Sequence, residues 1–151
     1  MNYIRIDEDD LLNGEGIRVV LWVTGCAHNC KGCHNPETHN PYAGQLFDEK
    51  AKQHLFKILE RDYISGVTFS GGDPLFPSNL PVITELAKEI NKLFPNKTIW
   101  LYTGYKYDQV KHYEVFNYIN VVVEGPYIEE LRSPELPWVG SSNQEVIKIV
   151  K

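Results

Sequence analysis

Residues 17–33 read IRVVLWVTGCAHNCKGC, an apolar run that leads directly into a cluster of cysteines. The run Ile17–Thr24 is rich in β-branched residues, follows Asn13-Gly-Glu-Gly16 and stops at Gly25, which predicts a largely buried strand. The cysteines then occupy the loop after this strand. We therefore expect them at the carboxyl end of a core strand, where open α/β sheets bind their ligands.

Helical and extended patterns alternate along the rest of the chain. Phe47–Glu60 has an apolar stripe, with Asp48 as its N-cap or as a first-turn acid, and is expected to form a helix. A second helix is expected to begin near Ser78 or Asn79, with Pro81 in its first turn, and to be ended by Pro95-Asn96. A third helix is predicted at Tyr107–Phe116. Further strands are predicted at Gly66–Ser70, Thr98–Tyr102, Ile119–Val123 and Glu145–Val150. This alternation predicts one α/β domain over residues 1–151 with a mainly parallel sheet.

Four loops follow the predicted strands and should meet on one face of the molecule. They are the cysteine loop, Gly71-Gly-Asp-Pro74, Thr103-Gly-Tyr105 and Glu124-Gly-Pro126. In a parallel sheet the carboxyl ends of neighbouring strands lie at the same edge. The sequence thus predicts that these loops build a single ligand site.

Size and composition exclude several classes of protein. The chain has 151 residues, of which 42% are hydrophobic and 23% charged, as expected for one globular domain. It is well short of the roughly 250 residues of a complete eight-fold α/β barrel. A net charge of -5 argues against a nucleic-acid partner. The start of the chain resembles no signal peptide and no apolar run could cross a membrane, so we expect a cytoplasmic protein.

The chain has three cysteines, all between Cys26 and Cys33. An odd number at such close spacing makes a poor disulfide framework and favours a metal site. A 4Fe-4S cluster on three thiolates would keep one iron without a protein ligand. Zinc is the competing metal, with His28 or His34 as a fourth ligand. An iron-sulfur electron carrier is a weaker alternative because simple ferredoxins use four cysteines, and three incidental thiols are weaker still.

The spacing CxxxCxxC resembles the signature of the radical S-adenosylmethionine enzymes. Within that superfamily the chain resembles, over nearly its full length, the family that activates the anaerobic (class III) ribonucleoside-triphosphate reductase. The motifs that carry this resemblance are Asn13-Gly-Glu-Gly16, Val23-Thr-Gly-Cys26, Ser70-Gly-Gly-Asp-Pro-Leu75, Ile99-Trp-Leu-Tyr-Thr-Gly-Tyr105, Glu124-Gly-Pro-Tyr127 and Trp138-Val-Gly-Ser-Ser-Asn-Gln144.

The resemblance implies a function. Cys26, Cys30 and Cys33 would hold a 4Fe-4S cluster, and the amino and carboxylate groups of S-adenosylmethionine would bind its open iron. An electron from a donor, typically flavodoxin in this family, would cleave the sulfonium to methionine and a 5′-deoxyadenosyl radical, which would take a hydrogen atom from a glycine of the partner reductase. By analogy the protein forms a homodimer that binds a dimeric reductase. The implied fold is a partial, open (βα) barrel of the radical S-adenosylmethionine type.

The resemblance also implies residues that bind S-adenosylmethionine. Gly32, Cys33 and His34 would line the cofactor side of the cysteine loop, and Gly71, Gly72 and Asp73 would meet its methionine end. Thr103-Gly-Tyr105 and Glu124 either reach the ribose or adenine or form ordinary turns. Trp138–Gln144 contacts the partner, closes over the site, or is a surface loop with a packed tryptophan. Two other functions stay open: activation of another glycyl-radical enzyme such as pyruvate formate-lyase, and a zinc-binding module without enzymatic activity.

Overall fold

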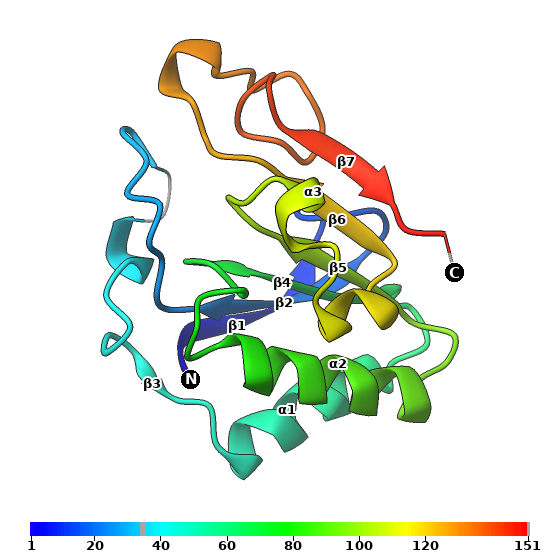
Figure 1. The fold of residues 1–151 in the computed structure, drawn as a ribbon. Helices are drawn as coiled ribbons and strands as arrows, with labels where there is room; N and C mark the ends of the chain where they lie inside the picture. Colours follow the sequence, from blue (N-terminus) through cyan, green and yellow to red (C-terminus); the bar gives the residue numbers. More distant parts are fainter. Residues whose placement is uncertain (34–35, 151) are drawn as a thin grey trace.

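The computed structural model describes residues 1–33 and 36–150, and within these residues seven strands form one open mixed sheet (Figure 1). The strand order is β3-β1-β2-β4-β5-β6-β7. The four central strands are parallel to one another: β2 (Arg18–Val23), β4 (Gly66–Gly71), β5 (Thr98–Tyr102) and β6 (Val121–Glu124). The outer strands pair antiparallel with their inner neighbours: β1 (Asn2–Asp10), β3 (Gln45–Leu46) and β7 (Glu145–Lys148).

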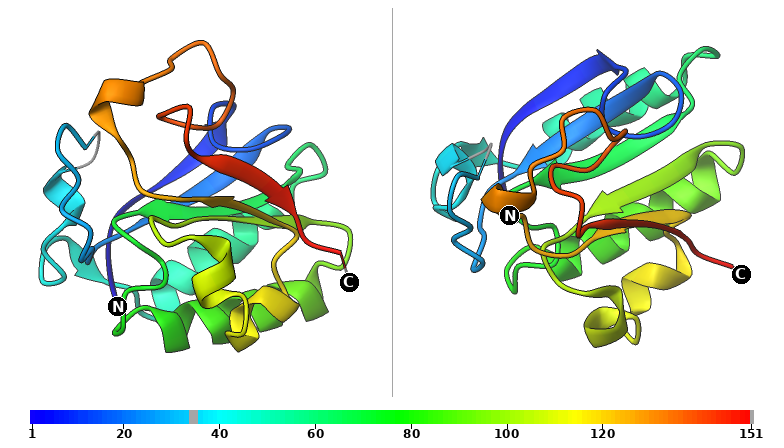
Figure 2. Two further views of the ribbon diagram at one scale, coloured as in Figure 1. Left: turned by 45° about the horizontal axis from the view of Figure 1, so that its top comes forward. Right: turned by 90° about the horizontal axis from the view of Figure 1, so that it is seen from above.

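The helices lie on one face of the sheet (Figures 1 and 2). From β2 through β4 and β5 to β6, each connection steps to the next strand in the same direction. Because such crossovers share one hand, steps in one direction place their helices on the same face. These helices are α1 (Glu49–Leu59), α2 (Leu80–Leu93), the short α3 (Tyr107–Val110) and the 3-10 turn η2 (Glu114–Asn117).

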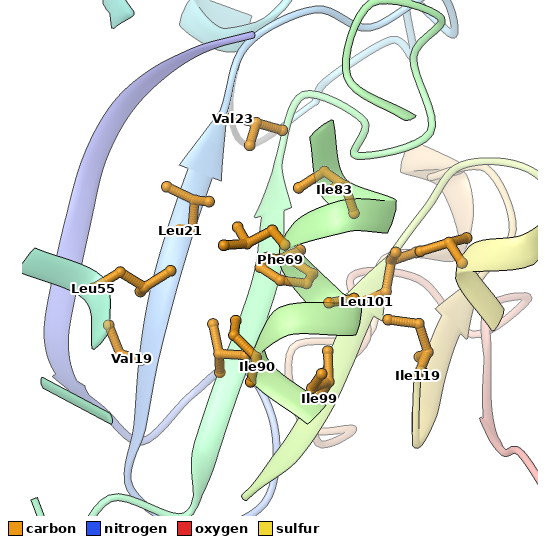
Figure 3. Close-up of a cluster of buried hydrophobic side chains, with 14 of the residues drawn as sticks. Val19, Leu21, Val23, Leu55, Phe69, Ile83, Ile90, Ile99, Leu101 and Ile119 are labelled. Atoms are coloured by element: carbon orange, nitrogen blue, oxygen red, sulfur yellow. The ribbon is translucent and has the colours of Figure 1, made fainter. Parts of the chain in front are cut away.

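The helix-covered face holds the main core. Side chains alternate along each strand, so Val19, Leu21 and Val23 of β2 point towards the helices together with Phe69 of β4 and Leu101 of β5 (Figure 3). All of these side chains are fully buried. They pack against apolar residues of α1 and α2, namely Leu55, Ile58, Leu59, Ile83, Leu86, Ala87 and Ile90.

The other face of the sheet has no α-helix of the described residues over it; the segment on that side contains only the short 3-10 helix η3 (Glu129–Leu131). The residues between the core positions point there, and they are Arg18, Thr68, Ser70, Trp100 and Tyr102 among others. A small second cluster of Trp100, Val121 and Val123 packs with Trp138 and Val139 from the segment after β6. This segment, drawn in orange to red, rises on the side opposite α1 and α2 (Figure 1).

The first helix begins as the sequence predicts. Asp48 has an extended backbone and its side chain accepts a hydrogen bond from the backbone N–H of Ala51, which caps the free amides of the first turn. The second helix follows Asn79 and has Pro81 in its first turn, also as predicted. None of the helices in the described residues is long and apolar enough to cross a lipid bilayer.

The predicted helix Tyr107–Phe116 is wrong. The chain forms α3, leaves the helical conformation at Tyr113, and then forms η2. Val110 of α3 and Val115 of η2 are both buried and five positions apart, which is about 140° around a continuous helix. Breaking the helix lets both side chains reach the core.

Strand β1 was not expected from the sequence. It carries four acidic residues between Asp7 and Asp10, and its pairing with β2 shifts register between Tyr3 and Arg5. This irregularity removes the simple alternation that marks a half-buried strand. The two antiparallel edges make the sheet mixed, with parallel pairing confined to its centre. The sheet is open at β3 and β7, and a closed barrel does not form within the described residues.

Candidate functional site

The three cysteines lie in the loop after β2, as the sequence predicts, and all three line one cavity of about 580 Å³. Their thiols are free and half-buried. The loop turns sharply at Asn29 and Gly32, whose φ angles are 50° and 72°, and the backbone N–H of Cys33 donates to the carbonyl of Cys30. These turns bring residues seven positions apart to the same cavity.

The predicted convergence of four loops on one face is confirmed. Besides the cysteines, the cavity is lined by Gly71 at the end of β4 and Gly72 after it, Thr103 and Gly104 after β5, and Gly125 after β6. Its floor is the uncovered face of the sheet, from which Trp22, Ser70, Tyr102 and Val123 contribute. Sequence reasoning missed these floor residues, although each alternates with a core residue of its strand.

Two parts of the cavity wall were not predicted: Leu11–Asn13 of the β1–β2 loop and residues 134–137. Trp138, Val139, Gly140 and Gln144 also line the cavity, in agreement with the expectation that Trp138–Gln144 closes over the site. Leu11 and Leu12 are 67% and 79% exposed. The cavity therefore runs along the sheet from the cysteines to an exposed apolar edge.

Asp73 is a buried hydrogen-bonding centre beneath the cavity. Its carboxylate accepts from His28 Nε2 at 2.6 Å, from Thr103 Oγ1 at 2.9 Å, and from the backbone N–H groups of Gly104 and Leu75 at 3.0 and 2.9 Å. The residue is 1% exposed and is absent from the described cavity lining. Direct contact of Asp73 with a cofactor stays a prediction; in this structure its oxygens hold three loops together.

Gly71 and Gly72 are required by close packing of the main chain. Gly71 has a φ of 109°, and a Cβ atom on it would lie 2.4 Å from the carbonyl oxygen of Val23. A Cβ atom on Gly72 would lie 2.5 Å from the carbonyl oxygen of Gly25. The backbone N–H groups of Gly72 and Asp73 donate to these same two carbonyls. The glycines thus join the β4 loop tightly to the start of the cysteine loop.

The remaining predicted residues differ in their surroundings. Gly32 lies against the side chain of Glu129, with its Cα so close that a Cβ atom would be 2.7 Å from Glu129 Cδ. His34 lies outside the described residues. Glu124 is buried and accepts from Lys106 Nζ and the backbone N–H of Tyr107, so it fixes the start of α3. The geometry of Glu124 thus supports the structural alternative for this residue.

The polar segment near the end of the chain fastens the cavity wall. Gln144 accepts from the backbone N–H groups of Gly140 and Ser141 and donates to the carbonyl of Gly125. Asn143 donates to the carbonyl of Pro126. These hydrogen bonds join the end of the segment 125–144 to its beginning. Trp138, with a φ of 68°, packs edge-on against Trp100 at a centroid distance of 5.0 Å.

The chemistry of the cysteine loop fits a metal cluster with sulfur ligands. Among residues 1–33 and 36–150, no three His, Cys, Asp or Glu side chains lie close enough together to hold a metal ion. The three free thiols nevertheless share one loop and one cavity, and thiolates are the usual ligands of iron-sulfur clusters. Burial raises the pKa of Cys26, so a bound metal must displace its proton. The Nε2 atom of His28 is already bonded to Asp73.

Comparison with known proteins gives a consistent result. A family model described as "4Fe-4S single cluster domain" matches residues 12–147. Three relatives are each named anaerobic ribonucleoside-triphosphate reductase-activating protein. The one from Enterobacteria phage T4 is 45% identical over 97% of this chain and 93% of its own length. Those from Escherichia coli K12 and Haemophilus influenzae are 41% and 40% identical over 97% and 95% of this chain, and over 97% and 96% of their own lengths.

Proposed function

The chain belongs to the family of anaerobic ribonucleoside-triphosphate reductase-activating proteins, and we propose that it is an activating oxidoreductase that generates a glycyl radical on that reductase. The observation that carries this proposal is the cavity into which three free thiols open beside the loops after β4, β5 and β6. The cavity offers sulfur ligands, glycine-rich walls and an aromatic floor in one place.

In this proposal Cys26, Cys30 and Cys33 hold a 4Fe-4S cluster. Three thiolates leave one of four irons without a protein ligand, which suits binding of the amino and carboxylate groups of S-adenosylmethionine. When both are bound, they supply reductive cleavage of the sulfonium and removal of a hydrogen atom from a glycine of the reductase. Every other requirement, namely binding, orientation and exclusion of water, has to be met by the side chains and backbone of this chain.

The cavity walls are suited to that task. Gly71 and Gly72 line the cavity and are our candidates for the methionine end, with Asp73 directly behind them, and Gly32, Cys33 and His34 are the candidates on the cluster side. Trp22, Tyr102 and Val123 give the floor a low polarity. Burial raises the pKa of Tyr102 further above its ordinary value, so its phenol stays protonated and the floor carries no charge there.

The architecture supports the finer assignment of a partial, open barrel of the radical S-adenosylmethionine type. In a (βα) barrel the strands advance in one direction, the helices cover the outside, and the site lies at the carboxyl ends of the strands. The order β2-β4-β5-β6, the helices on one face and the four convergent loops agree with each of these features.

The family also suggests partners and a cellular location. We propose the anaerobic ribonucleoside-triphosphate reductase as the protein substrate, a flavodoxin-type donor as the source of the electron, and a homodimer as the active form. The support for the reductase is that the relatives from phage T4 and Escherichia coli K12 are named as activating proteins of that reductase. Three free thiols suit the reducing conditions of the cytoplasm, where we propose that the protein acts.

One experiment tests the activity and its alternatives. The protein is reconstituted anaerobically with iron and sulfide, reduced with dithionite, and incubated with S-adenosylmethionine and either the anaerobic reductase or pyruvate formate-lyase. We expect release of methionine and 5′-deoxyadenosine, and a glycyl-radical resonance with the reductase. Zinc-loaded protein and the variants Cys26→Ala, Cys30→Ala and Cys33→Ala should be inactive.

Each alternative function predicts a different result in this experiment. A resonance with the lyase alone would assign the protein to another glycyl-radical enzyme. Absence of cleavage, together with tight binding of one zinc ion, would support the non-enzymatic module. Retained cleavage in any of the single cysteine variants would contradict the three-thiolate site.

A further inference from the structure

We propose that His28 is a positioning residue, which fixes the cysteine loop to the loops after β4 and β5 through the buried carboxylate of Asp73. This inference rests on the proposed function, because it concerns the same loop and the cluster that the loop would hold. It assigns a specific role to a residue that lies between the first two cysteines and is neither a proposed cluster ligand nor one of the residues at which the loop turns.

The contacts of the His28 ring define this role. Nε2 donates to Asp73 Oδ2 at 2.6 Å, and the ring packs edge-on against Tyr105 at a centroid distance of 4.5 Å. The ring also rests on Gly104, where a Cβ atom would lie 2.5 Å from His28 Cδ2. Any side chain at position 104 would therefore push the ring away. His28 is enclosed by the end of β5 and is 17% exposed.

Asp73 is a rigid acceptor for this bond. Thr103, Gly104 and Leu75 each donate a hydrogen bond to its carboxylate and orient it independently of His28. The backbone carbonyl of Asp73 accepts from Asn79 Nδ2, which also donates to the carbonyl of Thr24, the residue directly after β2. A charged acceptor held by several donors gives a short and directional hydrogen bond. The cysteine loop is thus tied to a fixed point on the sheet.

Because of the position of His28 in the loop, its hydrogen bond to Asp73 affects the placement of the neighbouring cysteines. His28 is two residues from both Cys26 and Cys30. Thr103 and Gly104, which share its acceptor, line the wall of the cavity that all three cysteines also line. The His28–Asp73 bond therefore sets the placement of the first two thiols relative to the cavity walls. Outer residues that orient metal ligands typically change metal affinity or activity by about 10- to 100-fold when removed.

The test compares variants that separate the hydrogen bond from the bulk of the ring. His28→Leu removes the donor and keeps an apolar side chain, whereas His28→Gln keeps a donor near the position of Nε2. His54→Leu is the matched control, because His54 is an exposed histidine on α1. Thermal unfolding first establishes that each variant is folded.

The first readout needs neither cluster nor activity. In the metal-free protein we expect the thiols of Cys26 and Cys30 to react with iodoacetamide several-fold faster in His28→Leu than in wild type, because the untied loop opens more often. His28→Gln should react at nearly the wild-type rate. Equal rates in His28→Leu and wild type would overturn the proposal, whatever the function of the protein.

The second readout uses the reconstituted protein. For His28→Leu we expect a broadened electron paramagnetic resonance spectrum of the reduced cluster, a weaker spectral change on addition of S-adenosylmethionine, and cleavage reduced about 10- to 100-fold. His28→Gln should recover most of each signal, and His54→Leu should match wild type. If His28→Gln is as impaired as His28→Leu, the hydrogen bond is not the cause and the proposal fails. If wild type itself binds no cluster, the proposed function fails instead, and the alkylation rates still decide the role of His28.

Discussion

Successive residues of each central strand point to opposite faces of the sheet, and the two faces have different surroundings. On β4, Val67 and Phe69 belong to the main core under the helices, whereas Ser70 belongs to the cavity floor and Thr68 bonds the Arg18 side chain on the same face. Both kinds of residue are buried. The difference lies in what covers them: apolar helix residues on one face, and loops, a cavity and a second small cluster on the other. Stability and the candidate site therefore have separate sets of residues in the same four strands.

This separation follows from the topology. Because the strand order from β2 to β6 does not reverse, all crossover helices lie on one face and the opposite face is free for polar and aromatic side chains. A sheet with helices on both faces needs apolar residues at nearly every strand position. Substitutions on the two faces should therefore have different effects on the free energy of unfolding.

The largest expected effect comes from Phe69→Ala on the helix-covered face. Phe69 is fully buried between strands and helices, and removing its ring leaves a cavity in the main core (Figure 3). We expect a loss of about 3–5 kcal/mol in the free energy of unfolding. The neighbouring Ser70→Ala, on the cavity side, is the control and should change it by less than about 1 kcal/mol. Urea denaturation measures both, and equal losses would contradict the division between the faces.

Arg18→Met tests the one buried cation among the described residues of the cavity-side face. The guanidinium donates to Thr68 Oγ1, Thr98 Oγ1 and the carbonyls of Glu15, Val67 and Thr98, and it lies over Trp100. Burial lowers the pKa of Arg18 to about 10, so it is still protonated at neutral pH.

Methionine fills a similar volume but cannot donate a hydrogen bond to any of these five acceptors, for which we expect a loss of about 2–3 kcal/mol. The exposed Arg5→Met is the control for removal of a charge. Urea denaturation at neutral pH compares the two. A loss no greater than that of Arg5→Met would mean that the hydrogen bonds of Arg18 contribute little to the stability of this face.

The helix-covered half of the fold could be predicted because its signals are local. β-branched runs mark β2 and β6, the Thr98–Tyr102 strand matches β5 at both ends, and Asp48 caps α1 as expected. The convergence of the loops followed from the rule that parallel strands end at one edge. Prediction failed where the pattern is irregular, as in β1, or where two buried residues cannot share one helical stripe, as at Val110 and Val115.

The candidate site was predictable in its cysteines and only partly in its surroundings. The spacing of Cys26, Cys30 and Cys33 is a local feature, and the loop after β2 brings all three to one cavity. The bond between His28 and Asp73 joins residues 45 positions apart, and no local pattern marks such a pair. The floor residues could have been predicted, because they alternate with core residues along each strand. That inference requires knowing which strand positions face the helices.

Asp48→Ala tests the edge of the helix-covered face. The alanine cannot accept the hydrogen bond from the Ala51 N–H, so one amide of the first turn of α1 loses its partner. We expect a loss of about 1 kcal/mol, measured by urea denaturation. Because α1 lies away from the cavity, alkylation rates of the three thiols should stay at wild-type values. Faster alkylation would show that the two faces are coupled through α1. The exposed Glu49→Ala, in the same turn, is the control for the loss of one negative charge.

The smallest expected effect concerns the residues with the largest role in the proposed chemistry. In the triple variant Cys26→Ser, Cys30→Ser, Cys33→Ser, we expect the free energy of unfolding of the metal-free protein to change by less than about 1 kcal/mol. The buried residues of the main core come from the strands, the helices and their connections, and none of the described residues from 26 to 33 and 36 to 44 is among them. The cysteine loop is held instead by hydrogen bonds of Gly25, Cys26 and His28, which serine at the three positions leaves in place. A loss of several kcal/mol would mean that the thiols stabilise the fold, as they do in small zinc domains. A small loss, together with complete loss of iron binding, would place the function of these three residues entirely on the cavity side of the sheet.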